Sequence, residues 1–109
     1  MENYLAKYDQ IDAIYAHDDN LAIGAIEALR AVGLAGEIPI ISIGGMPESF
    51  EYVKSGEITA TFVLSIKEDS ATCLRIFQDI FAGEPVDKYN HNTPVKVTQE
   101  NVDTADPAW

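Results

Sequence analysis

The sequence is poor in cysteine and in basic residues. Cys73 is the single cysteine, so no intrachain disulfide can form, and its place in an apolar helical pattern indicates a small core residue rather than a nucleophile. Lysine and arginine number 7 against 18 aspartates and glutamates, which gives a formal net charge of −11. Nucleic acids and anionic membrane surfaces attract basic patches, so this balance argues against both as partners.

Long hydrophobic runs are also lacking. No apolar stretch is long enough to span a bilayer. The segment Met1–Lys7 has neither the basic start nor the apolar core of a secretory signal, so we expect no signal peptide in this chain. The protein is then either cytosolic or a piece that lacks its own beginning.

Patterns that carry catalysis or bind metals are missing as well. The sequence shows no serine–histidine–acid set, no pair of catalytic carboxylates and no phosphate-binding loop, so we expect no enzyme activity. The run His17-Asp18-Asp19 resembles a metal site only superficially, because adjacent carboxylates on a turn point different ways and His91 is the only other histidine. We expect no metal and no cofactor.

What the chain does contain is a strand–turn–helix pattern that occurs three times. Its 109 residues are enough for one domain with a modest core. We expect buried strands covered on both faces, a short last strand at 94–98, and a polar, mobile tail at 99–109. The expected strand–helix pairs cover residues 11–16 and 19–32, 38–43 and 48–54, and 58–64 and 67–81.

This order predicts an α/β fold with a parallel βαβαβ sheet and right-handed crossovers. In such sheets, ligands bind beyond the carboxyl ends of the strands. The turns at 17–20, 44–48 and 64–68 all follow strands and therefore meet at that edge. The sequence thus predicts a ligand site built from these turns.

The first of these turns carries the strongest candidates. Asp18 is suited to accept hydrogen bonds from vicinal hydroxyl groups, with a second helix-capping carboxylate as the alternative. Asp19 is interpreted as the helix cap. His17 either contacts the ligand, senses pH, or is simply exposed at the strand end.

The other two turns give less specific signals. Gly44 and Gly45 either let backbone amides approach a ligand or form a tight turn with positive φ, and their spacing does not match a dinucleotide fingerprint. Ser65, followed three residues later by Glu68, has the form of a capping box at the start of the last helix.

The expected helix at 67–81 has an apolar stripe that needs a partner. Three parallel strands offer it little surface, so we expect self-association through this helix, with helices exchanged between chains. The members of the stripe are Ala71, Cys73, Leu74, Phe77, Ile80 and Phe81.

Three segments resemble the type I periplasmic sugar-binding proteins, the ribose- and galactose-binding components of ABC importers. Tyr15-Ala-His-Asp-Asp-Asn-Leu-Ala-Ile-Gly-Ala25 is similar to the family pattern aromatic-Ala-x-Asn-Asp-x-Met-Ala-x-Gly-Ala. Ile40-Ile-Ser-Ile-Gly-Gly-Met-Pro47 is similar to the family's next strand and glycine turn, and Ser55-Gly-Glu-Ile-Thr-Ala-Thr61 to its Gly-Lys-Leu-x-Ala-Thr segment. The resemblance extends from about Tyr4 to Asp103 and places the chain in the carboxyl-terminal part of such a protein.

The resemblance implies a two-lobed, periplasmic parent protein that holds a sugar or sugar-like polyol between its lobes and serves a membrane permease. Residues 1–65 would be strand–helix repeats of the C-terminal lobe, an incomplete Rossmann-like sheet. Residues 66–90 would pack on the absent N-terminal lobe, and residues 91–109 would be a last strand and tail. The chain would then carry half of the site.

The resemblance also implies ligand positions. Asp18 falls where the family has a sugar-binding asparagine, and Asp19 matches the aspartate that follows it. Gly44 falls where many members have a ligand-binding aspartate, and Leu64 where some have a ligand-binding glutamine. These differences leave the identity of the sugar open.

Two other interpretations remain. The effector-binding part of a LacI-type transcription repressor has the same fold, and an upstream helix-turn-helix rather than a signal peptide would identify it. A stand-alone flavodoxin-like enzyme or signalling domain would instead be a tightly folded monomer with a covered sheet.

Overall fold

The structure is a computed structural model that describes residues 1–108 of the chain; Trp109 lies outside the described residues. Helices and strands alternate as the sequence predicts, and the α/β fold class is confirmed. The elements are α1 (Glu2–Lys7), β1 (Ile14–Ala16), α2 (Asp19–Ala31), β2 (Ile40–Gly44), α3 (Pro47–Ser55), β3 (Ala60–Val63), α4 (Ile66–Ala82) and β4 (Val95–Val97).

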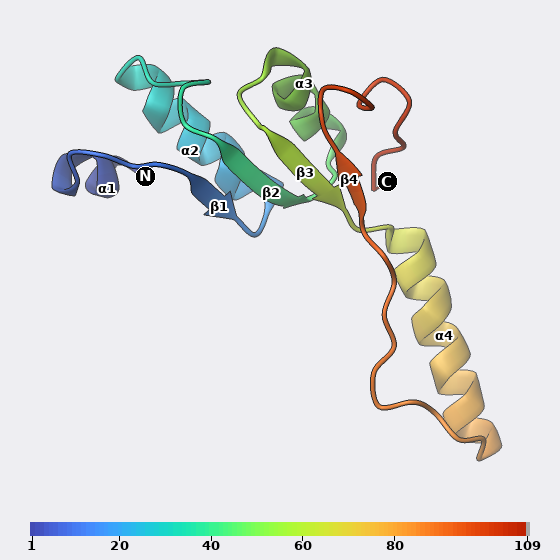
Figure 1. The fold of residues 1–109 in the computed structure, drawn as a ribbon. Coiled ribbons are helices and arrows are strands. Elements are labelled where there is room, and N and C mark those ends of the chain that lie inside the picture. Colours follow the sequence, from blue (N-terminus) through green and yellow to red (C-terminus); the bar gives the residue numbers. More distant parts are fainter. Residues whose placement is uncertain (109) are drawn as a thin grey trace.

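The sheet has the strand order β1-β2-β3-β4. The first three strands are parallel, as predicted, but β4 pairs antiparallel with β3 through Val63 and Val95. The direction of β4 follows from the path of the chain. The chain leaves the sheet at the end of β3, runs out along α4 and returns to the same place, so it must re-enter in the opposite direction (Figure 1).

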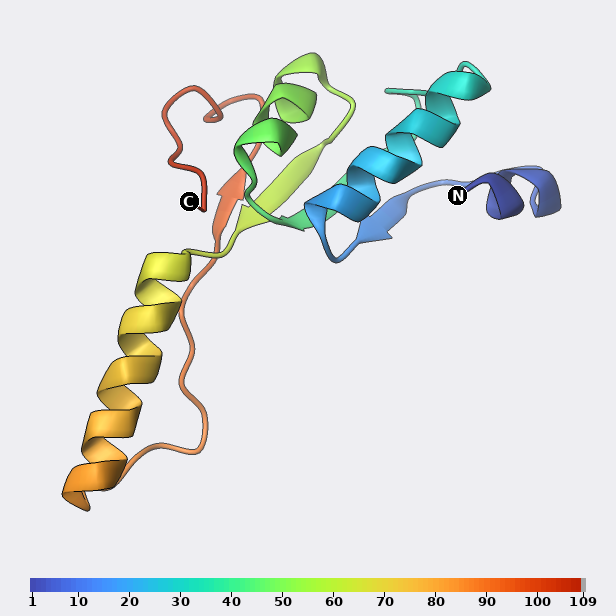
Figure 2. The ribbon, with the colours of Figure 1, turned by 180° about the vertical axis from the view of Figure 1, so that it is seen from behind.

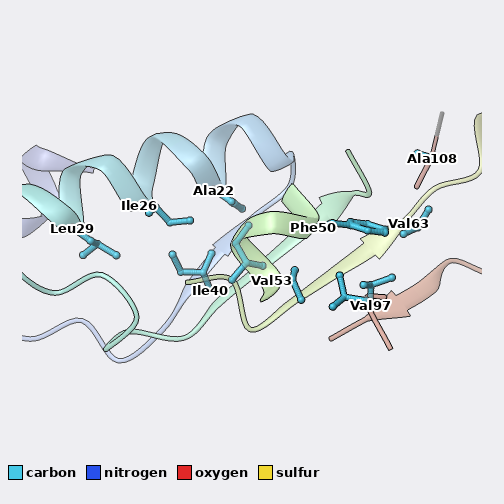
Figure 3. Close-up of a cluster of buried hydrophobic side chains, with 12 residues drawn as sticks. Ala22, Ile26, Leu29, Ile40, Phe50, Val53, Val63, Val97 and Ala108 are labelled. Atoms are coloured by element: carbon cyan, nitrogen blue, oxygen red, sulfur yellow. The ribbon is translucent and has the colours of Figure 1, made fainter. Parts of the chain in front are cut away.

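Helices α2 and α3 cover one face of the sheet, as both ribbon views show (Figures 1 and 2). Ala22, Ile26 and Leu29 recur at helical spacing along α2 and are buried against Ile40 of β2 (Figure 3). Phe50 and Val53 of α3 continue the core toward Val63 and Val97. This core fixes the position of the turns that lead into α2 and α3.

The opposite face of the sheet has no helix of the described chain packed on it. Side chains alternate between the two faces of a strand, and the register pairs Tyr15 with Ile41 on this second face. These side chains are 65% and 41% exposed, respectively. The expectation that the strands are covered on both faces is therefore wrong for the part of the chain that the structure describes.

The segment after β4 is folded back on the molecule, so the expectation of a mobile tail is also wrong up to residue 108. Val102 and Ala108 are buried in the main core. The Ala108 N–H donates to the Gly45 carbonyl at 2.8 Å, which ties the chain end to the turn between β2 and α3.

Helix α4 projects away from the sheet together with the returning segment 83–94 (Figures 1 and 2). The radius of gyration is 17.5 Å, whereas a compact chain of this length has about 13 Å. No residue of α4 is buried, and Leu74, Phe77, Ile80 and Phe81 are each more than half exposed. None of the helices in residues 1–108 combines the length and the apolar character needed to cross a membrane.

The projecting helix exposes its apolar stripe because its polar side faces the returning segment. Asn92 receives a hydrogen bond from Thr72 at 3.2 Å and donates one to Asp69. Cys73 is exposed, so its interpretation as a core residue is wrong. The stripe on which it lies has no partner among the described residues.

Candidate ligand-binding edge

The turn from β1 to α2 places two adjacent carboxylates in different surroundings. Asp18 has extended backbone angles and is the N-cap of α2, and its side chain accepts a hydrogen bond from the Asn20 N–H at 2.8 Å. Asp19 is the first helical residue. The predicted capping role of Asp19 is therefore wrong, because only the extended residue before the helix can turn its side chain back onto the first-turn amides.

Asp19 instead lies beneath the turns and is fully buried, with 0% exposure. Its Oδ1 accepts hydrogen bonds from the hydroxyls of Ser42 at 2.5 Å and Thr61 at 2.9 Å. Its Oδ2 accepts from the backbone N–H groups of Gly45 and Met46, at 2.7 and 2.8 Å, and from the Ser49 hydroxyl at 2.9 Å. One carboxylate thus binds β2, β3, the β2–α3 turn and α3 to the start of α2.

This set of donors keeps the buried carboxylate ionised. Burial acts to raise the pKa of Asp19, but hydrogen bonds from Ser42, the Met46 amide, Ser49 and Thr61 outweigh it, and the pKa lies below its usual value. All five donors are hydroxyls or backbone amides rather than cations. The negative charge is stabilised entirely by dipoles.

The turn between β2 and α3 is shaped by the same contacts. Gly45 has a φ of +85°, and a Cβ atom at this position would lie 2.7 Å from Val63, so only glycine fits. The amides of Gly45 and Met46 point toward Asp19, and the Gly44 carbonyl accepts from the Leu64 N–H at 3.1 Å. The Gly45 and Met46 amides thus bind inward, to Asp19.

The structure brings the three turns together at the predicted edge. Asp19 links the first turn to the second, and the bond between Leu64 and Gly44 links the second to the third. Asp18 and His17 are exposed there, and the His17 ring stacks on Tyr15 with the ring centroids 6.3 Å apart. The ligand-binding roles of Asp18, His17, Gly44 and Leu64 stay predictions.

The third turn contributes an apolar side chain and a helix cap. Leu64 is 43% exposed and offers no polar group from its side chain. Ser65 is the N-cap of α4, as predicted, and its hydroxyl accepts from the Glu68 N–H at 3.2 Å. The hydroxyl of Ser65 is therefore used within the protein.

The polarity of the edge limits what it can bind. Helix N-termini attract anions through free amides, but here Asp18 occupies the start of α2 and Ser65 the start of α4. Helix α3 begins with Pro47, which has no N–H, and the Met46 amide before it binds Asp19. What remains exposed at Asp18 is a hydrogen-bond acceptor, which suits the hydroxyl groups of a neutral ligand better than a phosphate or carboxylate.

The sequence carries a signal from which the Asp19 cluster can be predicted. Ser42 and Thr61 are polar residues inside otherwise apolar, buried strands, and Ser49 lies on the buried side of α3. Buried hydroxyls require partners, and an acidic residue at the edge of the same sheet is a suitable one. Among residues 1–108, no group of three or more histidine, cysteine or acidic side chains is arranged to hold a metal ion.

Comparison with known proteins connects this geometry to one family. The family model described as the periplasmic binding protein domain matches residues 1–85. The xylitol-binding protein of Mycolicibacterium smegmatis is 29% identical over 96% of this chain and 30% of its own length. The D-allose-binding periplasmic protein of Escherichia coli is 31% identical over 71% of this chain and 25% of its own length.

Solved structures give the same result. An ABC transporter periplasmic solute-binding protein from Actinobacillus succinogenes with bound D-allose superposes with a TM-score of 0.82 at 29% identity, over 95% of this chain and 36% of that one. A solute-binding protein from Bacillus halodurans with bound myo-inositol gives 0.78 at 33% identity, over 94% and 35%. The chain therefore spans about a third of the length of the relatives it matches.

Proposed function

Because the chain belongs to the periplasmic binding protein domain family, we propose that it is part of the solute-binding component of an ABC-type importer. Its ligand is a sugar or sugar-like polyol. Relatives named for ribose, D-allose and xylitol support this ligand class. The observation that carries the proposal is the edge itself, where three strand-to-helix turns meet and Asp18 presents a free acceptor.

The chain carries half of a site formed between two lobes. In this proposal residues 1–65 are strand–helix repeats of the C-terminal lobe, residues 66–90 pack on the N-terminal lobe, and residues 91–109 form the last strand and tail. The apolar stripe of α4, exposed without a partner among the described residues, supports this division. The two lobes close around the sugar, and a membrane permease recognises this closed form. The parent protein works in the periplasm.

The ligand edge is tested by titrating the isotope-labelled chain with xylitol, D-allose and myo-inositol and following backbone amide shifts by NMR. Half of a site should give a dissociation constant on the order of 10 mM or weaker, with the shift changes confined to residues 17–20 and 64–65. Asp18→Ala should abolish them, whereas Asp103→Ala, which removes an exposed carboxylate far along the chain, should not.

Two results would contradict the proposal. If the amide shifts do not change at high sugar concentration, or change only at other residues, the edge is not the sugar site. Micromolar affinity would show that the site is complete within this chain. The LacI-type repressor remains the alternative, and a helix-turn-helix encoded upstream of this segment in its gene would decide in its favour.

We also propose that isolated chains associate through the apolar stripe of α4. Phe77 and Phe81 stack on each other at the surface with their ring centroids 6.5 Å apart, and Phe81 is 86% exposed. The net charge of −11 opposes association, so salt should strengthen it. Sedimentation should show dimers or larger species that Phe77→Glu disperses and Gln78→Glu does not. A monomer at high concentration and high salt would refute this.

A further inference from the structure

The buried carboxylate of Asp19 joins segments that are distant in sequence at the point where the ligand edge forms. Its partners are 23 to 42 residues away along the chain. Two of them, the amides of Gly45 and Met46, belong to a turn whose first two residues are glycines with positive φ. Such a turn has little conformational preference of its own.

We infer that Asp19 is a positioning residue, which sets the conformation of the 44–46 turn and holds it in fixed relation to Asp18. Asp19 follows Asp18 directly in the chain, and its Oδ2 holds the turn from below through Gly45, Met46 and Ser49. The two carboxylates therefore have different roles. Asp18 is exposed to solvent at the edge, whereas Asp19 is buried beneath the edge and holds the 44–46 turn in place.

Fixing the turn from below has a consequence for ligand binding. The turn cannot rotate to offer the Gly45 and Met46 amides to a ligand without breaking two bonds to a charged acceptor, which are stronger than bonds to a neutral one. The Gly45 carbonyl belongs to the same peptide group as the Met46 N–H, and it accepts a hydrogen bond from the Ala108 N–H. This peptide group is therefore held at both its donor and its acceptor. The edge is thus preformed in the absence of ligand, and this reduces the entropy lost on binding.

Ionised Asp19 is essential to this arrangement. A neutral carboxylic acid would carry a proton on one oxygen, and neither oxygen is free of donors. The other titratable side chains on the segments that Asp19 joins are His17 and Asp18 before α2, Glu27 and Arg30 on α2, and Glu48, Glu51, Tyr52 and Lys54 on α3; β2 and β3 contribute none. All of these are exposed except Tyr52, which is half-buried. Protonation of Asp19 should therefore release the turn while the helices remain.

The test is NMR spectroscopy of the wild-type chain and of Asp19→Asn, with Asp18→Asn as the matched control. In Asp19→Asn the Gly45 and Met46 amides should exchange with solvent roughly tenfold faster, because a charged acceptor is replaced by a neutral one. Amides of Ile26 and Leu29 in the core should be unchanged. Asp18→Asn should leave both turn amides as they are.

A pH titration supplies a readout that a purely structural role would not change. In the wild type, the shifts of the Gly45 and Met46 amides should move together in one transition below the usual aspartate range, and in Asp19→Asn that transition should vanish. Because the titration uses the wild type, it tests whether Asp19 controls the turn even if Asp19→Asn does not fold. Turn amides that do not titrate, or that respond equally to Asp18→Asn, would overturn the inference.

The link to ligand binding rests on the proposed function and is tested separately. If the wild type shows sugar-induced shifts at Asp18, Asp19→Asn should weaken sugar binding at least several-fold, and Ser42→Ala, which leaves the turn contacts intact, should weaken it less. Equal weakening by both variants would overturn the link. An absence of sugar effects in the wild type would count against the proposed function alone, because the exchange and titration results stand without sugar.

Discussion

Asp18 and Asp19 carry the same side chain, yet the structure uses them in opposite ways. Asp18 ends an extended segment and turns its carboxylate back onto the first turn of α2. Asp19 is the first helical residue, and its side chain lies against the sheet instead. There it is fully buried and receives five hydrogen bonds. The change from extended to helical backbone between the two residues thus separates an exposed cap from a buried, hydrogen-bonded carboxylate.

Acid should destabilise the chain through Asp19. Its pKa is lower in the folded protein than the ordinary value of 3.8, so the unfolded chain binds more protons between those two pKa values. The contribution to stability is therefore complete above the ordinary pKa and is lost as the pH falls through the folded pKa. Urea denaturation between about pH 6 and pH 2 should show the free energy of unfolding falling in this window.

The same experiment needs a control for a second carboxylate. A hydrogen bond from Arg30 lowers the pKa of Glu57, so Glu57 contributes in the same direction. In Glu57→Gln most of the acid-dependent loss should remain, since the partner of Glu57, Arg30, is 44% exposed and solvent weakens the pair, whereas in Asp19→Asn most of the loss should disappear. An unchanged pH dependence in Asp19→Asn would show that Asp19 is not the responsible group.

The location of these two aspartates could be predicted from the sequence, but their separate roles could not. The sequence placed both on the turn at the carboxyl ends of the strands, and periodicity sufficed for that. It could not decide which one caps α2, because the outcome depends on where the helix begins to within one residue, the least certain feature of a sequence pattern. The burial of Asp19 depends on Ser42 and Thr61, which come close only after the sheet forms.

At the scale of elements, two glycines show how differently the chain uses the same residue. Gly45 lies in the β2–α3 turn with a φ of +85°, and a Cβ there would lie 2.7 to 2.8 Å from three Val63 atoms. Gly24 lies inside α2, where a Cβ would meet no atom within 4 Å. The first glycine is required by its surroundings and the second is not.

Alanine at these positions should therefore change stability in opposite directions. Gly45→Ala combines an unfavourable left-handed conformation with overpacking and should lower the free energy of unfolding by about 3 kcal/mol. Gly24→Ala removes a poor helix former from an open position and should raise it by up to about 1 kcal/mol. Chemical denaturation monitored by circular dichroism measures both. A neutral Gly45→Ala would mean that the turn can move away from Val63.

Hydrophobic periodicity predicted the order and type of the helices and strands. It did not predict the residues at which they begin and end, or the elements against which they pack. The pattern at 58–64 predicted a strand, and β3 occupies residues 60–63 of it. The antiparallel direction of β4 depends on the path of α4 and the returning segment 83–94, which no local sequence pattern predicts. Similarly, the continuous apolar character of β1 and β2 predicted helices on both faces of the sheet, whereas residues 1–108 place helices on one face.

At the scale of the molecule, the chain divides into a projecting arm, residues 65–93, and a folded body formed by the other described residues. The family assignment is confirmed by the match over residues 1–85, which includes α4. Nearly the whole chain superposes on solved relatives of which it covers about a third. The shape of the arm is therefore not peculiar to this chain, and the energetic contribution of the arm to the body can be tested separately.

The body should fold without the arm. Val63 of β3 and Val95 of β4 are paired antiparallel neighbours, so Leu64 and Pro94 are the next facing positions and can be joined by a two-residue Asn-Gly turn in place of residues 65–93. No residue of α4 is buried, and closing a long loop with a short one lowers the entropic cost of pairing β4. The free energy of unfolding should stay within about 1 kcal/mol of the full chain.

Small-angle scattering and denaturation test this shortened chain together. The radius of gyration should fall from 17.5 Å to about 12 Å, the value for a compact chain of about 80 residues. Val97→Ala within it should cost about 2 kcal/mol, because Val97 is fully buried and its loss leaves a cavity only if β4 is still paired. Self-association should disappear with α4. If the shortened chain is unfolded, or if Val97→Ala does not change its free energy of unfolding, the arm stabilises the sheet through contacts between chains.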